Sequence, residues 1–199
     1  NERFPQLEML DWLFVMGGPM NVYEEDRYPW LKHEKEFIEK SIDVGKVVIG
    51  FCLGAQLIAD VLGVRIYDNS WKEIGWFEVG LTAEGATSGV FTRLPERFMA
   101  FHWHGDTFDI PKGCTRVAES EACRNQAFEY KGRVFALQFH LETSLESIKA
   151  LVANCGDDLS FGKYVQPESK MLSMSEYLSK LEKIMESFLD AISDSSVVR

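Results

Sequence analysis

The sequence predicts an α/β fold with a mostly parallel central sheet flanked by helices, and with a small antiparallel sheet. In the first third of the chain, apolar runs at 12–16 and 47–51 alternate with segments of helical periodicity. Strands that are joined through a helix pair in parallel, with right-handed crossovers. After residue 70, shorter segments rich in aromatic and β-branched residues predict antiparallel strands instead.

The first predicted strand is the continuous apolar run 12–16, which we expect to be buried on both faces. It ends in a Gly-Gly-Pro loop at 17–19. A helix should begin near Pro29, because proline suits a first helical turn, and end at Gly45.

The second unit repeats this order. Residues 47–51 predict another buried strand, and Cys52 opens a helix that ends at Gly63. The apolar positions of that helix share one face; they are Leu57, Ile58, Val61 and Leu62.

Five further strands are predicted by composition in the middle of the chain. They are residues 71–81, 98–103, 115–120, 126–130 and 133–139. Lys131-Gly132 predicts a hairpin turn between the last two. The capping box Thr143-x-x-Glu146 predicts a helix toward Ala153.

The C-terminal part is predicted to be irregular over 156–173. A second capping box, Ser173-x-x-Glu176, then precedes a long stretch with apolar residues at helical spacing. We expect this last helix to pack on the domain.

Length and composition predict one compact domain over residues 1–199. The net charge of −10 disfavours binding to nucleic acid and to anionic membranes. Because the sequence shows neither an apolar run of membrane length nor a signal peptide, we expect a cytoplasmic protein. The four cysteines form no CxxC pair, which predicts reduced thiols; they are Cys52, Cys114, Cys123 and Cys155.

Cys52 lies at the junction of a predicted strand and helix, between Gly50 and Gly54. A residue that projects from such a turn has a strained backbone, and its neighbours two positions away must be small. A helix N-terminus also favours thiolate over thiol. The pattern therefore predicts a nucleophile, although a buried cysteine beside two packing glycines would look similar.

His140 is the candidate base, because it closes the strand 133–139 and precedes Glu142 by two residues, a spacing that places both side chains on one face. A salt-bridged strand end is the alternative for this pair alone. His33 lies in a charged run that predicts a solvated helix face. His102 and His104 flank Trp103 and could form a metal pair, but no third ligand stands at a recognisable spacing, so no metal site is predicted.

A thiolate that attacks a carbonyl needs backbone N–H groups to stabilise the negative charge that develops. The Gly-Gly-Pro loop can supply one such group, and the N–H of Leu53 at the helix start can supply another. The alternative for the glycine pair is a simple tight turn.

Four motifs together resemble the class I glutamine amidotransferases, especially the glutaminase part of GMP synthase. They are GGP, GFCLGAQ, HGDTF and FALQFHLE, which occur in family order between residues 12 and 151. The resemblance implies the three-layer, flavodoxin-like fold of that family.

It also implies the chemistry. Cys52 would attack the side-chain amide of glutamine, expel ammonia and form a γ-glutamyl thioester that water cleaves, with His140 moving protons and Glu142 orienting it. Gly18 and Leu53 would supply the oxyanion N–H groups. The amino-acid end of glutamine would be held by Gln56, Trp103, His104, Gly105 and Asp106. No cofactor is implied.

The sequence departs from the family in three places. The family opens with a strand and a helix before the GGP strand, whereas this sequence has only about a dozen residues there, so either it begins within the domain or that unit is lost. Residues 157–199 look like an extension with a helix instead of a synthetase domain. His102-Trp103 stands where GMP synthases often have small polar residues. We therefore expect the ammonia acceptor on a separate synthetase or ligase subunit, which the sequence does not identify.

Two alternatives remain open. The same triad would hydrolyse γ-glutamyl peptides, since any γ-glutamyl amide gives the same thioester. A noncatalytic regulatory or binding subunit could use the same fold, although a complete triad argues against it.

Overall fold

A computed structural model describes residues 4–159, 161–174 and 176–195. The chain builds one mixed sheet of seven strands in the order β1-β2-β7-β6-β5-β3-β4. The strands are β1 (Trp12–Val15), β2 (Val47–Phe51), β3 (Ile66–Leu81), β4 (Arg97–Phe108), β5 (Thr115–Glu119), β6 (Ala127–Tyr130) and β7 (Val134–Leu137). The α-helices are α1 (Trp30–Asp43), α2 (Leu53–Val61), α3 (Leu145–Cys155), α4 (Glu168–Ser173) and α5 (Glu176–Asp194). Short 3-10 helices are η1 (Leu7–Met9), η2 (Gly85–Thr87), η3 (Phe91–Arg93) and η4 (Gly156–Asp158).

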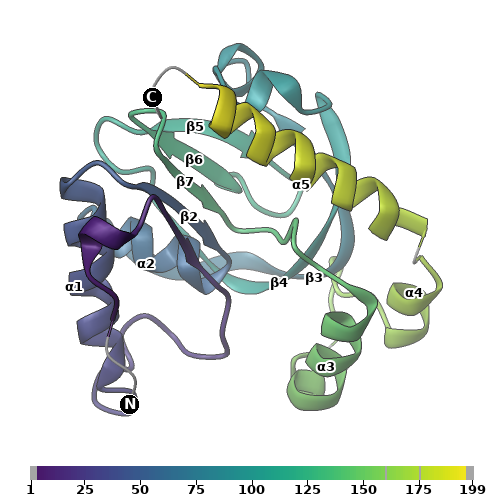
Figure 1. Ribbon diagram of the computed structural model, residues 1–199. Helices are drawn as coiled ribbons and strands as arrows, with labels where there is room; N and C mark the ends of the chain where they lie inside the picture. The colour runs from purple at the N-terminus through teal and green to yellow at the C-terminus, as the bar shows by residue number, and fades with distance from the viewer. Residues whose placement is uncertain (1–3, 160, 175, 196–199) are drawn as a thin grey trace.

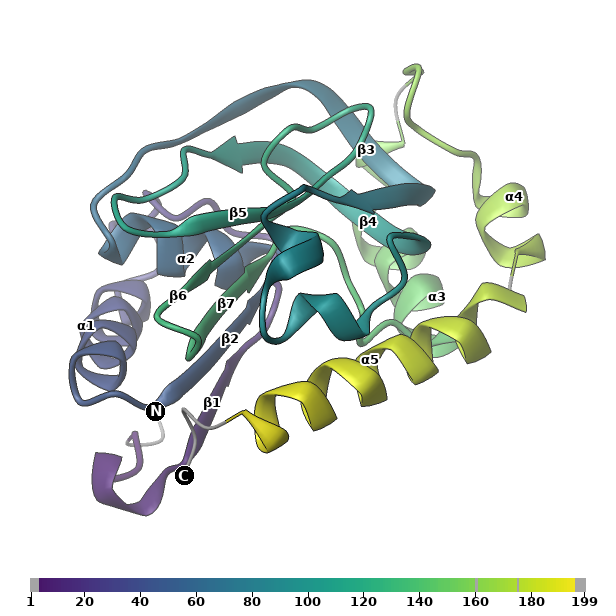
Figure 2. The same ribbon diagram turned by 90° about the horizontal axis from the view of Figure 1, so that it is seen from above.

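Helices cover both faces of the sheet, which gives three layers (Figure 1). Val48 of β2 packs in the core shared with α1 and α2, whereas its neighbours Val47 and Ile49 belong to the core shared with α5. This alternation follows from the pleat, since successive strand residues point to opposite faces. The view from above shows α5 running alongside the sheet, with α3 and α4 near its N-terminal end (Figure 2). The predicted α/β fold class is therefore confirmed.

The central sheet is not mostly parallel as predicted, and the antiparallel strands do not form a separate small sheet. β1, β2 and β7 are parallel, and β7 continues directly into antiparallel β6, β5, β3 and β4. The reason is the hairpin at Lys131 and Gly132, both with positive φ, which joins β6 to β7 inside one sheet. The turn was predicted correctly, but its consequence for the sheet was not.

Four local predictions were wrong. β1 has a single strand neighbour in the described part of the sheet, so Phe14 is 42% exposed instead of buried. The capping box of α3 is Ser144 and Ser147, one residue beyond Thr143 and Glu146. Ser173 ends α4, and its hydroxyl donates to the Lys170 carbonyl; the stretch 156–173, predicted to be irregular, contains η4 and α4. Residue 175, directly before α5, lies outside the described residues.

Within the three described ranges, we find no helix that combines the length and the apolarity needed to cross a membrane.

Candidate active site

Cys52 occupies a strained turn between β2 and α2. Its φ is 51° and its backbone N–H donates to the Leu137 carbonyl of β7 at 2.9 Å. A side chain on Gly50 would collide with the backbone of Gly54, and one on Gly54 would collide with the Val15 carbonyl of β1. Both glycines are thus required for α2 to start against the strand ends, and the turn projects the Cys52 side chain above them.

His140 and Glu142 reach the same place from the chain that follows β7. The backbone N–H of His140 donates to the Phe101 carbonyl of β4 at 2.9 Å, which fixes this extension beside β4. The imidazole Nδ1 lies 2.6 Å from Glu142 Oε1. A Cβ on Gly17 would lie 3.3 Å from His140 Cε1 and 3.5 Å from Cys52 Cβ, so the loop after β1 runs past both side chains. The structure therefore brings together the three predicted residues.

The charge of the imidazole follows from these neighbours. Burial lowers the pKa of His140, but the Glu142 charge and hydrogen bonds with Cys52 and Glu142 outweigh burial and raise the pKa to about 10. The imidazole is accordingly protonated at neutral pH in the free protein. Because Nδ1 is held by Glu142, Nε2 is the nitrogen left to face the sulfur.

Gly18 and Leu53 lie next to each other beside the sulfur. A Cβ on Gly18 would be 3.1 Å from the Leu53 side chain, and both residues line the cavity that contains Cys52. Leu53 is the first residue of α2, where backbone N–H groups lack a partner within the helix. The two predicted oxyanion donors therefore come from the loop after β1 and from the first residue of α2.

The cavity around Cys52 has a volume of about 860 Å³. The five predicted substrate-binding residues all line it: Gln56, Trp103, His104, Gly105 and Asp106. The Trp103 carbonyl oxygen lies 3.5 Å from the Cys52 sulfur, and the Gln56 amide nitrogen donates to Gln138 at 3.2 Å. The end of β4 thus forms the wall that faces the helix start.

Sequence reasoning missed three polar residues of this cavity. Lys72 of β3 pairs with Asp158 at 3.1 Å, and Asp158 also accepts from the Trp103 indole at 3.3 Å. Asn21 donates to Asp106 at 3.0 Å. These contacts join segments up to 86 residues apart, and no local motif marks them.

A cluster of buried polar side chains lies behind the end of β4 that lines the cavity. Glu73 of β3 meets His102 and His104 of β4, which makes it the third potential ligand that the sequence spacing did not show. Strand pairing places Glu73 opposite His104, and this register was not predicted.

The family described as "Glutamine amidotransferase class-I" matches residues 2–158. The "Putative glutamine amidotransferase-like protein YfeJ" of Salmonella typhimurium is 31% identical over 78% of this chain and 66% of its own length. A "GMP synthase [glutamine-hydrolyzing]" of Brachyspira hyodysenteriae is 25% identical over 80% of this chain and 31% of its own. The chain thus spans less than two thirds of each of these two relatives.

A solved structure also resembles this chain in both sequence and fold. The crystal structure of a glutamine amidotransferase from Thermotoga maritima is 33% identical and superposes with a TM-score of 0.86, covering 98% of this chain and 83% of that one.

Proposed function

Because the chain belongs to the class I glutamine amidotransferases, we propose that it hydrolyses the side-chain amide of glutamine with Cys52 as the nucleophile. The observation that carries the proposal is the meeting of Cys52, His140 and Glu142 in one cavity, although they lie on segments some 90 residues apart. A noncatalytic subunit would have no use for a strained turn with an imidazole and a carboxylate behind it.

The first half of the reaction forms a thioester. The Cys52 sulfur attacks the amide carbon of glutamine, and the carbonyl oxygen becomes an oxyanion that accepts from the Gly18 and Leu53 N–H groups. His140 Nε2 passes its proton to the amide nitrogen as the C–N bond breaks. Ammonia leaves, and the γ-glutamyl group stays on the sulfur.

The second half restores the enzyme. His140, now neutral, takes a proton from water as the water oxygen attacks the thioester carbon. The C–S bond breaks, the sulfur leaves as thiolate beside the imidazolium, and glutamate is released. Glu142 keeps the same ring nitrogen engaged in both halves, so that Nε2 serves as acid and then as base.

We assign substrate recognition to the end of β4, which faces the start of α2 across the cavity. The main chain from Trp103 to Asp106, together with Gln56, would hold the amino and carboxylate groups of glutamine. The cavity is rich in carboxylates, which favour an ammonium group; they belong to Glu24, Asp106, Glu142 and Asp158.

The direct test replaces Cys52 by alanine and measures ammonia release from glutamine and covalent labelling by a glutamine-mimicking electrophile. We expect turnover to fall by at least about 10³-fold and labelling to disappear. Cys114→Ala is the matched control: burial raises the pKa of the Cys114 thiol to about 11, so it is unreactive at neutral pH. Labelling that persists in Cys52→Ala, or that moves to Cys114, would overturn the mechanism.

The size of the cavity favours a second candidate, hydrolysis of γ-glutamyl peptides. A volume of about 860 Å³ lies near the upper end of the range for sites that hold drug-sized ligands. Comparing ammonia release from glutamine with amino-acid release from γ-glutamyl dipeptides separates the two. A larger kcat/KM for the dipeptides would make the protein a γ-glutamyl hydrolase, with the same roles for Cys52 and His140.

Domains of this family act with a synthetase partner and use glutamine, as in GMP synthase. We propose that the acceptor of ammonia is bound by a separate synthetase or ligase subunit. The measurement is ammonia release with and without the partner that copurifies with the full-length protein; a partner that leaves turnover and ammonia transfer unchanged would contradict this assignment. We also propose that residues 1–199 act as one domain in the cytoplasm.

A further inference from the structure

Glu73, His102 and His104 converge inside the antiparallel half of the sheet. The register of β3 and β4 places Glu73 opposite His104 and Gly75 opposite His102, so that the three side chains share one face. Their side chains are at most 1% exposed. Buried polar groups of this kind need partners that satisfy them fully.

Both ring nitrogens of His104 lie beside oxygen atoms that accept hydrogen bonds. Its Nδ1 lies 3.0 Å from the Asp106 carbonyl oxygen, which only accepts, and its Nε2 lies 3.2 Å from Glu73 Oε2. The same carboxylate oxygen accepts from the Ser120 hydroxyl and the Gln126 amide, which are the surroundings of an ionised carboxylate. A neutral imidazole has one N–H, so one ring nitrogen of His104 must turn a lone pair toward an acceptor, either Glu73 or the Asp106 carbonyl. A cation between His104 and Glu73 would remove this mismatch, because Nδ1 could then donate to Asp106 while Nε2 binds the ion.

Two of the three distances between the potential ligand atoms fit a metal ion, and all three atoms lie within 4.8 Å of one another. An ion with bonds of about 2.0 Å to nitrogen and oxygen in tetrahedral geometry holds its ligands about 3.3 Å apart. Glu73 Oε2 lies 3.2 Å from His104 Nε2 and 3.5 Å from His102 Nδ1. The longer distance is poor for a hydrogen bond but suits two ligands of one ion.

The surrounding groups support the same assignment. Metal-binding histidines usually donate their second ring nitrogen to a carbonyl, as the His104 ring can to Asp106, and ligating carboxylates are themselves hydrogen-bonded. Gln126 Oε1 is buried without a partner among the described residues. The amide nitrogen of the same side chain lies 2.5 Å from Glu73 Oε2 and 3.5 Å from His102 Nδ1, so the unpartnered oxygen belongs to a residue that borders the cluster.

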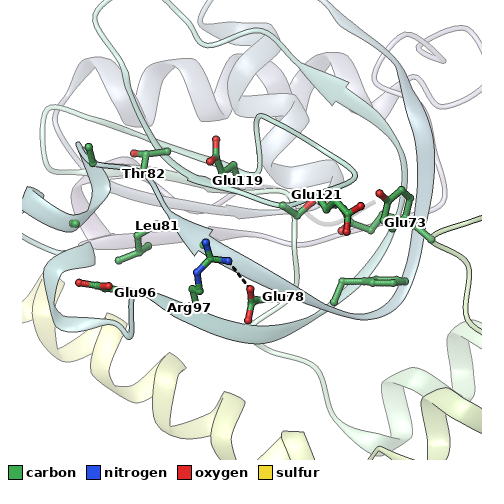
Figure 3. Close-up of a pocket in the computed structure, with 14 residues that line it drawn as sticks. Glu73, Glu78, Leu81, Thr82, Glu96, Arg97, Glu119 and Glu121 are labelled. Atoms are coloured by element: carbon green, nitrogen blue, oxygen red, sulfur yellow. Dashed lines mark hydrogen bonds and ion pairs between the residues drawn. The ribbon is translucent and has the colours of Figure 1, made fainter.

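A route for a cation leads to Glu73. This residue and Ser120 line a hollow of about 680 Å³ that shares no lining residue with the Cys52 cavity, and Figure 3 shows Glu73 at one end of it. Most charged side chains that line the hollow are negative. Arg97 is the cationic residue of the lining, and it is paired with Glu78. The carboxylates belong to Glu73, Glu78, Glu96, Glu119 and Glu121. Such a surface raises the local concentration of cations.

We propose that Glu73, His102 and His104 form a structural Zn²⁺ site that ties β3 to β4 behind the wall of the active-site cavity. Two imidazoles and a carboxylate are a known zinc ligand set, and imidazole ligands favour zinc over Mg²⁺ or Ca²⁺. We assign a structural role because the three side chains are buried away from the Cys52 cavity. Trp103, whose carbonyl faces Cys52, lies between the two histidines, so the ion would fix that carbonyl in place. The proposal does not depend on glutamine hydrolysis, because it concerns only the binding of an ion by these three side chains.

The test begins with the wild-type chain. The purified protein is stripped with a chelator, loaded with Zn²⁺ alone, and its metal content is measured by mass spectrometry; we expect about one ion per chain. Co²⁺ in its place should give the visible absorption of a tetrahedral site. Anomalous scattering at the zinc edge should place the ion between the three side chains.

The variant His102→Gln removes one ligand, and its matched control His33→Gln changes an exposed histidine of α1. We expect His102→Gln to weaken Zn²⁺ binding by more than about 10-fold and the control to leave it unchanged. If His102→Gln fails to fold, the wild-type measurements still decide. A wild-type protein that binds no zinc, with a His104 ring that carries protons on both nitrogens by nitrogen NMR, would overturn the proposal.

Discussion

Each half of the sheet buries a histidine beside a carboxylate, and the two sites behave differently. At the end of parallel β7, Glu142 serves one imidazole, and its charge helps to raise the pKa of His140 to about 10 against the effect of burial. Between antiparallel β3 and β4, burial lowers the pKa of His102 to about 4 despite the charge of Glu73. Burial outweighs the Glu73 charge at His102, and the charges of His104 and His140 lower its pKa further.

The difference shows that the balance between burial and the neighbouring charges decides the charge of a buried histidine. Glu142 Oε1 contacts His140 at 2.6 Å, and its other oxygen has no partner in the described part of the chain. His102 has instead two other histidines among its neighbouring charges, and both lower its pKa.

The largest expected effect is that of His140→Asn. Asparagine cannot exchange protons with Cys52, so we expect kcat for glutamine to fall by at least about 10⁴-fold while the fold is retained. Ammonia release and circular dichroism measure the two quantities. His33→Asn, on the exposed face of α1, is the control, and unchanged turnover in His140→Asn would mean that another group is the base.

Glu142→Gln should cost less and change the pH dependence. The pairing raises the folded-state pKa of His140 from 6.5 to about 10, so it stabilises the folded chain fully below 6.5 and this contribution is lost as the pH rises through 10. Without the charge, the alkaline limb of kcat/KM should move to lower pH, and kcat should fall by about 10²- to 10³-fold. An unshifted limb would show that Glu142 does not set the charge of the ring.

Gln166→Ala should weaken the antiparallel half without touching the nucleophile. The Gln166 side chain accepts from the Trp76 N–H at 3.0 Å and donates to the Trp76 carbonyl at 2.7 Å, as an added strand would. Because the substitution leaves both groups buried and unpaired, the free energy of unfolding should fall by about 2 kcal/mol. Denaturation in urea measures this, with exposed Gln6→Ala as the control. We expect kcat of the folded variant to stay close to that of the wild type. A large fall in kcat under conditions where the variant is folded would contradict the separation of the two halves.

The same contrast explains what the sequence could predict. Cys52 with its two glycines, and His140 with Glu142, are local patterns whose geometry follows from one turn or one strand. The Glu73 cluster and the Lys72–Asp158 pair depend on which residues of distant segments face each other, and composition does not specify that register. The exposed edge of β1 was missed for a related reason, because an apolar run does not reveal how many neighbours a strand has.

The smallest effect concerns the start of α3, directly after His140 and Glu142, where even a local prediction was off by one residue. The Ser144 hydroxyl accepts from the Ser147 N–H at 3.1 Å, and the Ser147 hydroxyl lies 2.9 Å from the Ser144 N–H. Ser144→Ala should therefore lower the free energy of unfolding by about 1 kcal/mol. Thr143→Ala, at the position chosen from the sequence, should change it by less than about 0.5 kcal/mol. The opposite order in thermal denaturation would restore Thr143 as the cap. Serine is also the better N-cap residue of the two, so side-chain preference and the observed backbone agree on Ser144.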